Sequence, residues 1–193
     1  MPPDQSPGAM EGYRARIAGT HADLGIPAGA MDARGLPLCA EAGDLVVAET
    51  EESGKQHLLA PDAAAAWQAL KDAARRDGVV LEIASAFRSF DRQVEIVRRK
   101  LGEGTGIDAI LCEVAPPGFS EHHTGRAIDI NTPGCEAFEE AFEQTAAFDW
   151  LQMNARRFGF FLSYPRGNAC GYIYEPWHWC YRQEQAPGAL AQI

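Results

Sequence analysis

Two short segments of the sequence place histidines close to carboxylate side chains. Residues 120–129 read SEHHTGRAID and residues 174–179 read YEPWHW, and together they hold three of the five histidines. A catalytic zinc typically takes three protein ligands and leaves one position for water. His122, Asp129 and His178 supply two imidazoles and one carboxylate, and too few ligands remain for a second metal. The sequence therefore predicts one mononuclear zinc site.

The first segment has the spacing of a loop that returns as a strand. His122 and Asp129 are seven residues apart, but Gly125 and the β-branched residues around it argue against a helix. Glycine permits the turn that such a loop needs. Alternation along a strand then puts Ala127 and Asp129 on one side and Ile128 on the other, facing the core.

The second segment suggests a different local geometry. Glu175 and His178 are three residues apart, so a single helical turn brings both side chains to one face. Pro176 is tolerated at the start of such a turn. Glu175 would then stand beside the metal-bound water as the general base. We expect Trp177 and Trp179 to shield the site and lower its dielectric constant.

Each of these residues also has an ordinary structural interpretation. We interpret His21, His57 and His123 as structural, since a single histidine near a turn is more often a surface or core residue than a ligand. Cys180 is a possible soft ligand, ranked below the aspartate of the predicted set. Glu121, taken alone, is accounted for by a surface ion pair. Only the combination of the two segments favours the catalytic interpretation.

Three motifs in this order resemble the zinc D-alanyl-D-alanine carboxypeptidases of the VanY type. They are Ser-x-His-x-x-Gly-x-Ala-x-Asp at 120–129, Glu-x-x-His at 175–178, and Ser-x-x-Arg-Ser-x-x-x-Gln at 85–93. That peptidase group is related in fold to the hedgehog signalling domain. The resemblance covers roughly residues 60–182.

The resemblance implies a role for each matching residue. His122, Asp129 and His178 match the zinc ligands, and Glu175 matches the catalytic base. Arg88 matches the arginine that meets the substrate near its C-terminal carboxylate or the scissile carbonyl, as a catalytic and substrate-binding residue. Further substrate-side polar positions are matched by Gln93, Ser120 and Ser85.

The activity that the resemblance implies is removal of a C-terminal D-alanine from peptidoglycan-type peptides, with one Zn²⁺ per chain. D,D or L,D specificity stays open. The alternatives are an endopeptidase or D,D-dipeptidase of the same fold, or an inactive zinc-stabilised binding module. The presence of Glu175 argues against the last of these. The expected partner is a peptidoglycan stem peptide or its fragments, and the expected state is a monomer.

Composition fits one soluble globular domain. The chain has 193 residues, 46% of them hydrophobic, and a net charge of −10. An acidic surface argues against binding to nucleic acid, which needs clustered Lys and Arg, and the apolar runs are too short to span a membrane. We see no signal peptide, which suggests a cytoplasmic location, or a periplasmic or envelope one for a mature form. The five cysteines do not settle whether Cys170 and Cys180 pair.

The elements that must position these residues are of mixed type. Without regular βαβ alternation, we expect an α+β fold, a small antiparallel sheet flanked by helices, hedgehog/DD-peptidase-like. Residues 9–182 are expected to form a single zinc peptidase domain between a disordered start at 1–8 and a tail at 183–193. Helices are expected at 10–24, 61–76, 89–102, 107–114 and 145–158. Strands are expected at 45–48, 57–59, 79–84, 127–130, 160–164, 172–174 and 179–181.

Overall fold

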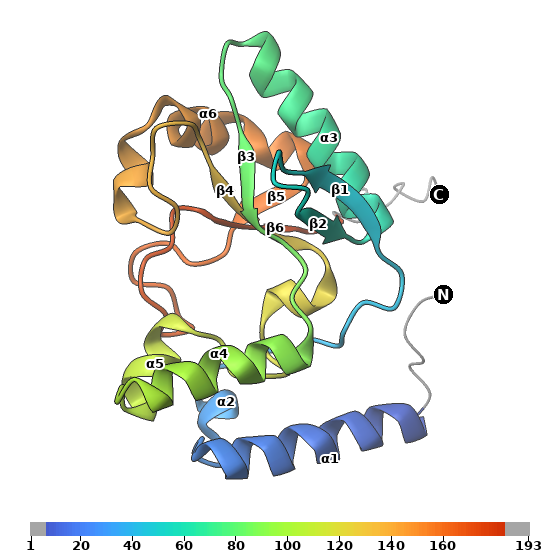
Figure 1. Ribbon diagram of the computed structural model, residues 1–193, viewed down its shortest axis with the longest axis vertical. Coiled ribbons are helices and arrows are strands. Elements are labelled where there is room, and N and C mark those ends of the chain that lie inside the picture. Colours follow the sequence, from blue (N-terminus) through green and yellow to red (C-terminus); the bar gives the residue numbers. More distant parts are fainter. Residues whose placement is uncertain (1–6, 184–193) are drawn as a thin grey trace, which may run out of the picture.

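A computed structural model describes residues 7–183, which form short strands and mostly short helices (Figure 1). The α-helices are α1 Pro7–Leu24, α2 Ala30–Ala33, α3 Pro61–Arg76, α4 Phe90–Gly102, α5 Ile107–Glu113 and α6 Ala146–Asn154. The 3₁₀ turns are η1 Glu121–Thr124, η2 Glu140–Gln144 and η3 Ala155–Phe158. The strands are β1 Val46–Thr50, β2 Gln56–Leu59, β3 Glu82–Ser85, β4 Ala127–Asn131, β5 Phe160–Leu162 and β6 His178–Tyr181.

A four-stranded antiparallel sheet in the order β3-β4-β6-β5 forms the centre of the fold. Its register sets Asp129 of β4 opposite His178 of β6 on one side and opposite Ser85 of β3 on the other. The hairpin of β1 and β2 makes a separate two-stranded sheet. The predicted α+β class and antiparallel pairing are thereby confirmed.

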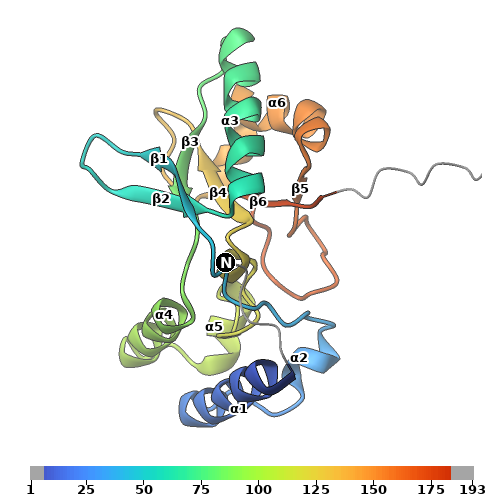
Figure 2. The same ribbon diagram turned by 90° about the vertical axis from the view of Figure 1, so that its right-hand side faces the viewer.

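The helices gather in two groups, one at each end of the molecule. Figures 1 and 2 both show α3 and α6 beside the sheet, with α1, α2, α4 and α5 at the opposite end. Each group has its own buried apolar cluster, the first including Trp67 and Ile128 and the second including Val97 and Ile110. Burial of a large apolar side chain stabilises a fold by about 1.5–3 kcal/mol. Figure 1 shows η1 in the space between the two groups.

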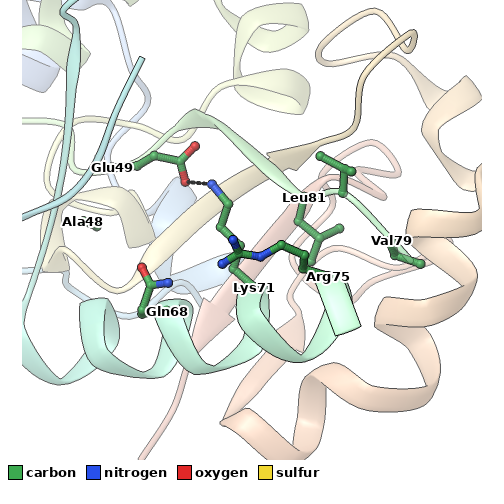
Figure 3. Close-up of a pocket in the computed structure, with 8 residues that line it drawn as sticks. Ala48, Glu49, Gln68, Lys71, Arg75, Val79 and Leu81 are labelled. Carbon is green, nitrogen blue, oxygen red and sulfur yellow. Dashed lines mark ion pairs between the residues drawn. The ribbon is translucent and has the colours of Figure 1, made fainter. Parts of the chain in front are cut away.

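Polar contacts at the surface tie the β1–β2 hairpin to α3. Glu49 of β1 accepts a hydrogen bond from Trp67 Nε1 at 3.1 Å and pairs with Lys71 Nζ at 2.8 Å. Figure 3 shows Lys71 reaching from α3 toward Glu49 at the edge of a shallow pocket, with Arg75 beside it. Both contacts connect β1 to α3, so we interpret the residues around this pocket as structural.

The ends of the helices follow the predicted signals. Pro61 stands at the start of α3, and the Ser89 side chain accepts a hydrogen bond from the backbone N–H of Arg92 to cap α4. The predicted helix at 145–158 is divided into α6 and η3. The helix expected from residue 10 begins at Pro7, so Pro7 and Gly8 are helical where we expected disorder. Residues 1–6 and most of the expected tail lie outside the described residues.

Two predicted strands are wrong in place or in kind. The strand expected at 79–84 begins only at Glu82, and Val80 is 51% exposed where we expected burial. Residues 172–174 form no strand, although they are apolar and partly β-branched. Their backbone groups bond to partners outside the sheet. Asn168 Oδ1 accepts from the N–H of Tyr172 at 3.2 Å, and Asn168 Nδ2 donates to the Tyr172 carbonyl at 2.8 Å. The N–H of Ile173 donates to the carbonyl of Cys112 at 2.9 Å.

The five cysteines are all free thiols, so Cys170 and Cys180 do not pair.

Among the described helices none combines the length and the apolar character that a membrane span requires.

Gly125 allows the chain to turn from η1 into β4. Its φ of 64° is left-handed, and a Cβ at this position would lie 2.9 Å from the backbone nitrogen of Ala60 and from Leu45 Cδ2. The same close approach carries a hydrogen bond of 2.8 Å from Ala60 N–H to the Gly125 carbonyl. Glycine is thus required here for both its backbone conformation and its lack of a side chain.

We expect Gly125→Ala to lower the free energy of unfolding by roughly 2–5 kcal/mol, from left-handed strain and overpacking together. Gly104→Ala is the matched control, because Gly104 also has a positive φ of 87° but nothing within 4 Å of an added Cβ. It should cost only about 1–2 kcal/mol from strain. Urea denaturation measures both, and equal losses would contradict the close approach at Gly125.

Candidate metal centre

Three predicted ligands from three different elements meet at one buried point. His122 lies on η1, Asp129 on β4 and His178 on β6. One ligand atom from each of them lies within 4.8 Å of the other two. His122 Nε2 is 3.2 Å from Asp129 Oδ2, and His178 Nδ1 is 3.0 Å from Asp129 Oδ1. The carboxylate therefore stands between the two imidazoles.

The outer nitrogens of both imidazoles have hydrogen-bond acceptors. His122 Nδ1 lies 2.7 Å from the carbonyl oxygen of Ala86, and His178 Nε2 lies 3.0 Å from Glu121 Oε2. A carbonyl or carboxylate oxygen accepts a hydrogen bond, so these outer nitrogens carry protons. His122 Nε2 and His178 Nδ1 then remain as the metal-binding atoms. Two such nitrogens and one carboxylate fit the donor set of a zinc ion with an open position.

Burial and hydrogen bonding shift the pKa values of the two candidate histidine ligands in opposite directions. Burial lowers the pKa of His122, which favours the neutral form that binds metal. Burial also disfavours charge on His178, but its hydrogen bonds to Asp129 and Glu121 raise its pKa to about 10. Without metal, His178 is therefore an imidazolium between two carboxylates. Metal binding at Nδ1 must displace that proton, so binding and proton release are coupled.

Glu121 is a candidate supporting residue of the site that the sequence analysis interpreted only as part of a surface ion pair. Besides His178, its Oε2 accepts a hydrogen bond from Ser163 Oγ at 2.5 Å, and Arg182 lies 3.7 Å from its Oε1. Burial disfavours its charge, but the bonds from His178 and Ser163 lower its pKa to about 2. A carboxylate that receives the outer N–H of a ligand histidine fixes the orientation of that ring. In the sequence, the position of Glu121 next to His122 was the one signal that could have indicated this role.

Glu175 reaches the site through a tight turn. The N–H of His178 donates to the carbonyl of Glu175 at 3.1 Å, which closes a four-residue turn in place of the expected helical turn. Glu175 Oε2 is 3.8 Å from His178 Nδ1. Burial raises the pKa of Glu175 to about 7. A carboxyl group near neutrality can both take and return a proton at physiological pH.

Arg88 also lies close to Asp129, with its Nη2 atom 3.8 Å from Asp129 Oδ2. Its guanidinium donates to Gln93 Oε1 at 3.0 Å and to Ser85 Oγ at 3.3 Å. Gln93 has no exposed surface, and its Nε2 donates to the carbonyl of Ala115. Ser85 and Gln93, expected on the substrate side, are thus placed where they orient Arg88.

The three candidate metal ligands line a cleft of about 440 Å³. Ser120, expected to contact substrate, is almost fully buried but lines this cleft. The ring of Tyr164 lies against His178, with centroids 4.7 Å apart. Phe138 stands half exposed at the cleft wall and touches Trp177 edge to face. The cleft thus joins the reactive groups to an aromatic wall.

The remaining candidates have structural partners. His123 faces away from the cluster, with Nδ1 2.7 Å from the Arg88 carbonyl and Nε2 accepting from Gly118 N–H. His57 pairs with Glu51, and His21 bonds to the carbonyl of Pro117. The group of possible ligands found among residues 7–183 excludes Cys180. These placements agree with the structural interpretation of the three histidines.

The buried His/Asp/His cluster in this α+β fold is a candidate centre for one metal ion. Residues 56–184 match the family model VanY, described as D-alanyl-D-alanine carboxypeptidase. The chain belongs to this VanY family of carboxypeptidases.

Known relatives and solved structures agree with that assignment. The chain is 38% identical over 162 residues to a protein of Bacillus subtilis (strain 168) provisionally named carboxypeptidase YodJ, covering 78% of this chain and 58% of that one. It is 37% identical to a D-alanyl-D-alanine carboxypeptidase of Enterococcus faecalis (strain ATCC 700802 / V583), covering 59% and 44%. The chain thus spans about half the length of these relatives.

Among solved structures, the LD-carboxypeptidase LdcB has a TM-score of 0.67 at 37% identity, covering 75% of this chain and 71% of that one. A VanY D,D-pentapeptidase structure in complex with Zn(II) has a TM-score of 0.57 at 34% identity, covering 72% and 79%.

We expect loss of Glu121 to weaken zinc binding without unfolding the protein. Glu121→Ala removes the acceptor of the His178 N–H and should lower zinc affinity about 10–100-fold, whereas Glu121→Gln, which keeps an acceptor oxygen, should lower it less. Titration of the metal-free protein against a chromophoric chelator measures this. Glu103→Gln, at the exposed residue that directly follows α4, is the control. An affinity for Glu121→Ala within twofold of wild type would contradict this role.

Proposed function

We propose that this protein is a zinc-dependent carboxypeptidase that releases the C-terminal D-alanine from peptidoglycan-type peptides. The observation that carries the proposal is the convergence of His122, Asp129 and His178, with Glu175 beside His178 and Arg88 beside Asp129. Similar proteins support the substrate class, since VanYB has been solved with D-alanine-D-alanine bound. That structure is 33% identical to this chain, with a TM-score of 0.57.

His122, Asp129 and His178 would hold the ion through Nε2, one carboxylate oxygen and Nδ1. When bound, zinc supplies Lewis acidity, which polarises a carbonyl and lowers the pKa of water to about 7. Glu175 takes the proton from the attacking water, since burial brings its pKa near neutrality. It then passes that proton to the leaving amine.

Arg88 supplies the positive charge that the substrate needs. Its side chain is held by Ser85 and Gln93, so its guanidinium is oriented before substrate arrives. The planar fork pairs with a carboxylate in bidentate fashion, which suits the free C-terminus that a carboxypeptidase must recognise. The same group can hold the oxyanion that develops at the scissile carbonyl.

The test is release of D-alanine by the zinc-loaded protein from two kinds of muropeptide, one ending in D-Ala-D-Ala and one ending in L-Lys- or diaminopimelate-D-Ala. We expect release from at least one of them, and the comparison assigns D,D or L,D specificity. Cleavage only of internal bonds, or only of free D-Ala-D-Ala, would favour an endopeptidase or dipeptidase instead. Absence of all three activities would contradict a catalytic role.

Two substitutions separate metal binding from proton transfer. Glu175→Gln should keep one zinc per chain while lowering kcat by at least about 10²-fold, because the amide cannot accept the proton. His122→Ala should lose both metal and activity. Elemental analysis and D-alanine release are measured on the same samples. Activity in Glu175→Gln would refute the assignment of the base, and full metal content in His122→Ala would refute the ligand set.

A further inference from the structure

The cleft that is lined by the three candidate metal ligands is also lined by one face of α4. Arg92, Ile96 and Arg99 line it, at spacings of four and three residues that put side chains on one helical face. Lys100 and Glu113 of α5 also line the cleft and are paired with each other at 2.8 Å. Beyond that pair, Arg92 and Arg99 give the α4 wall two positive charges, although the chain as a whole has a net charge of −10.

The two arginines on this wall are held only by ion pairs at the surface. Arg92 lies 2.8 Å from Glu95 and Arg99 lies 3.1 Å from Glu103, and all four side chains are more than half exposed. Exposed pairs of this kind contribute only about 0–1 kcal/mol. Neither glutamate lines the cleft. An anion entering the cleft can therefore replace them at little cost.

The positive groups are spaced for a short peptide. Arg88, 3.8 Å from Asp129, directly precedes the N-cap of α4. An α-helix rises 1.5 Å per residue, so Arg92 and Arg99 are separated by about 10 Å along it. An extended peptide advances about 3.3 Å per residue. The distance between the two arginines thus equals the length of about three residues of an extended peptide that runs along α4 from the candidate metal ligands.

We propose that Arg92 and Arg99 form a subsite for the carboxylate groups of the substrate peptide on the N-terminal side of the scissile bond. The inference rests on the proposed function and narrows its substrate class to acidic peptides. Apolar side chains of the cleft, among them Ile173 and Trp177, offer a carboxylate no partner. An acidic side chain of a bound peptide therefore finds its best ion-pairing partners in the arginines of α4.

The test uses two peptides with the same terminal D-alanine that differ in one group, a side-chain carboxylate or its carboxamide, up to three residues before the scissile bond. For the wild type we expect a KM about fivefold lower for the acidic peptide, with kcat unchanged, in line with an exposed charge pair. The preference should shrink in 0.5 M salt, because salt screens exposed charges.

The variants show whether the two arginines carry this preference. Arg92→Gln combined with Arg99→Gln should bring the KM ratio of the two peptides close to one and leave the amidated peptide unaffected. Arg98→Gln removes one positive charge from the same helix, against two in the double variant, but Arg98 lies outside the cleft lining, so this variant should behave as wild type. Equal KM values for the wild type, or an equal effect of Arg98→Gln, would overturn the proposal.

Release of D-alanine from neither peptide would contradict the proposed function rather than the subsite. In that case the subsite is tested by equilibrium binding of the two labelled peptides to the zinc-loaded protein, followed by fluorescence anisotropy. The same fivefold preference, lost in the double arginine variant, is expected. Equal binding of both peptides to the wild type would overturn the subsite on its own.

Discussion

The buried carboxylate of Asp129 is the constraint around which the site is organised. A buried charge without a partner costs several kcal/mol, so the fold must bring compensation to it. The imidazole of His122 and the imidazolium of His178 approach its two oxygens, and the guanidinium of Arg88 lies 3.8 Å from it. In the metal-free chain the imidazolium of His178 supplies the compensating charge, and in the metal-bound chain the ion supplies it.

The fold meets this constraint through sheet register and one turn. Pairing of β4 with β6 sets Asp129 opposite His178, and a slip of one residue would turn one of them to the other face. Gly125 provides the left-handed turn between η1, which carries His122, and β4, and apolar clusters at both ends hold these elements in place. Sites carried by strands and packed turns are held more tightly than sites on loops.

Much of this site could be predicted from the sequence because its signals are local. The motif around His122 and Asp129 contains its own turn and strand, and the resemblance supplied the pairing with His178. Contacts made only in three dimensions were not predictable: the supporting role of Glu121 depends on Ser163, 42 residues away. The strand expected at 172–174 is wrong for a similar reason, since local β-propensity does not reveal that Asn168 and Cys112 bond the backbone of these residues.

Charge distribution links the metal centre to the cleft around it. Exchange of the Nδ1 proton of His178 for a divalent ion adds one positive charge to a site that otherwise balances carboxylates against Arg88 and an imidazolium. Because Tyr164 and Trp177 limit contact with water, that charge acts in a low dielectric, where its attraction for a carboxylate or a developing oxyanion is strengthened. The acidic surface repels anionic peptides at long range. Selection for such a substrate must therefore occur inside the cleft, where the positive groups of the metal centre and of α4 follow one another.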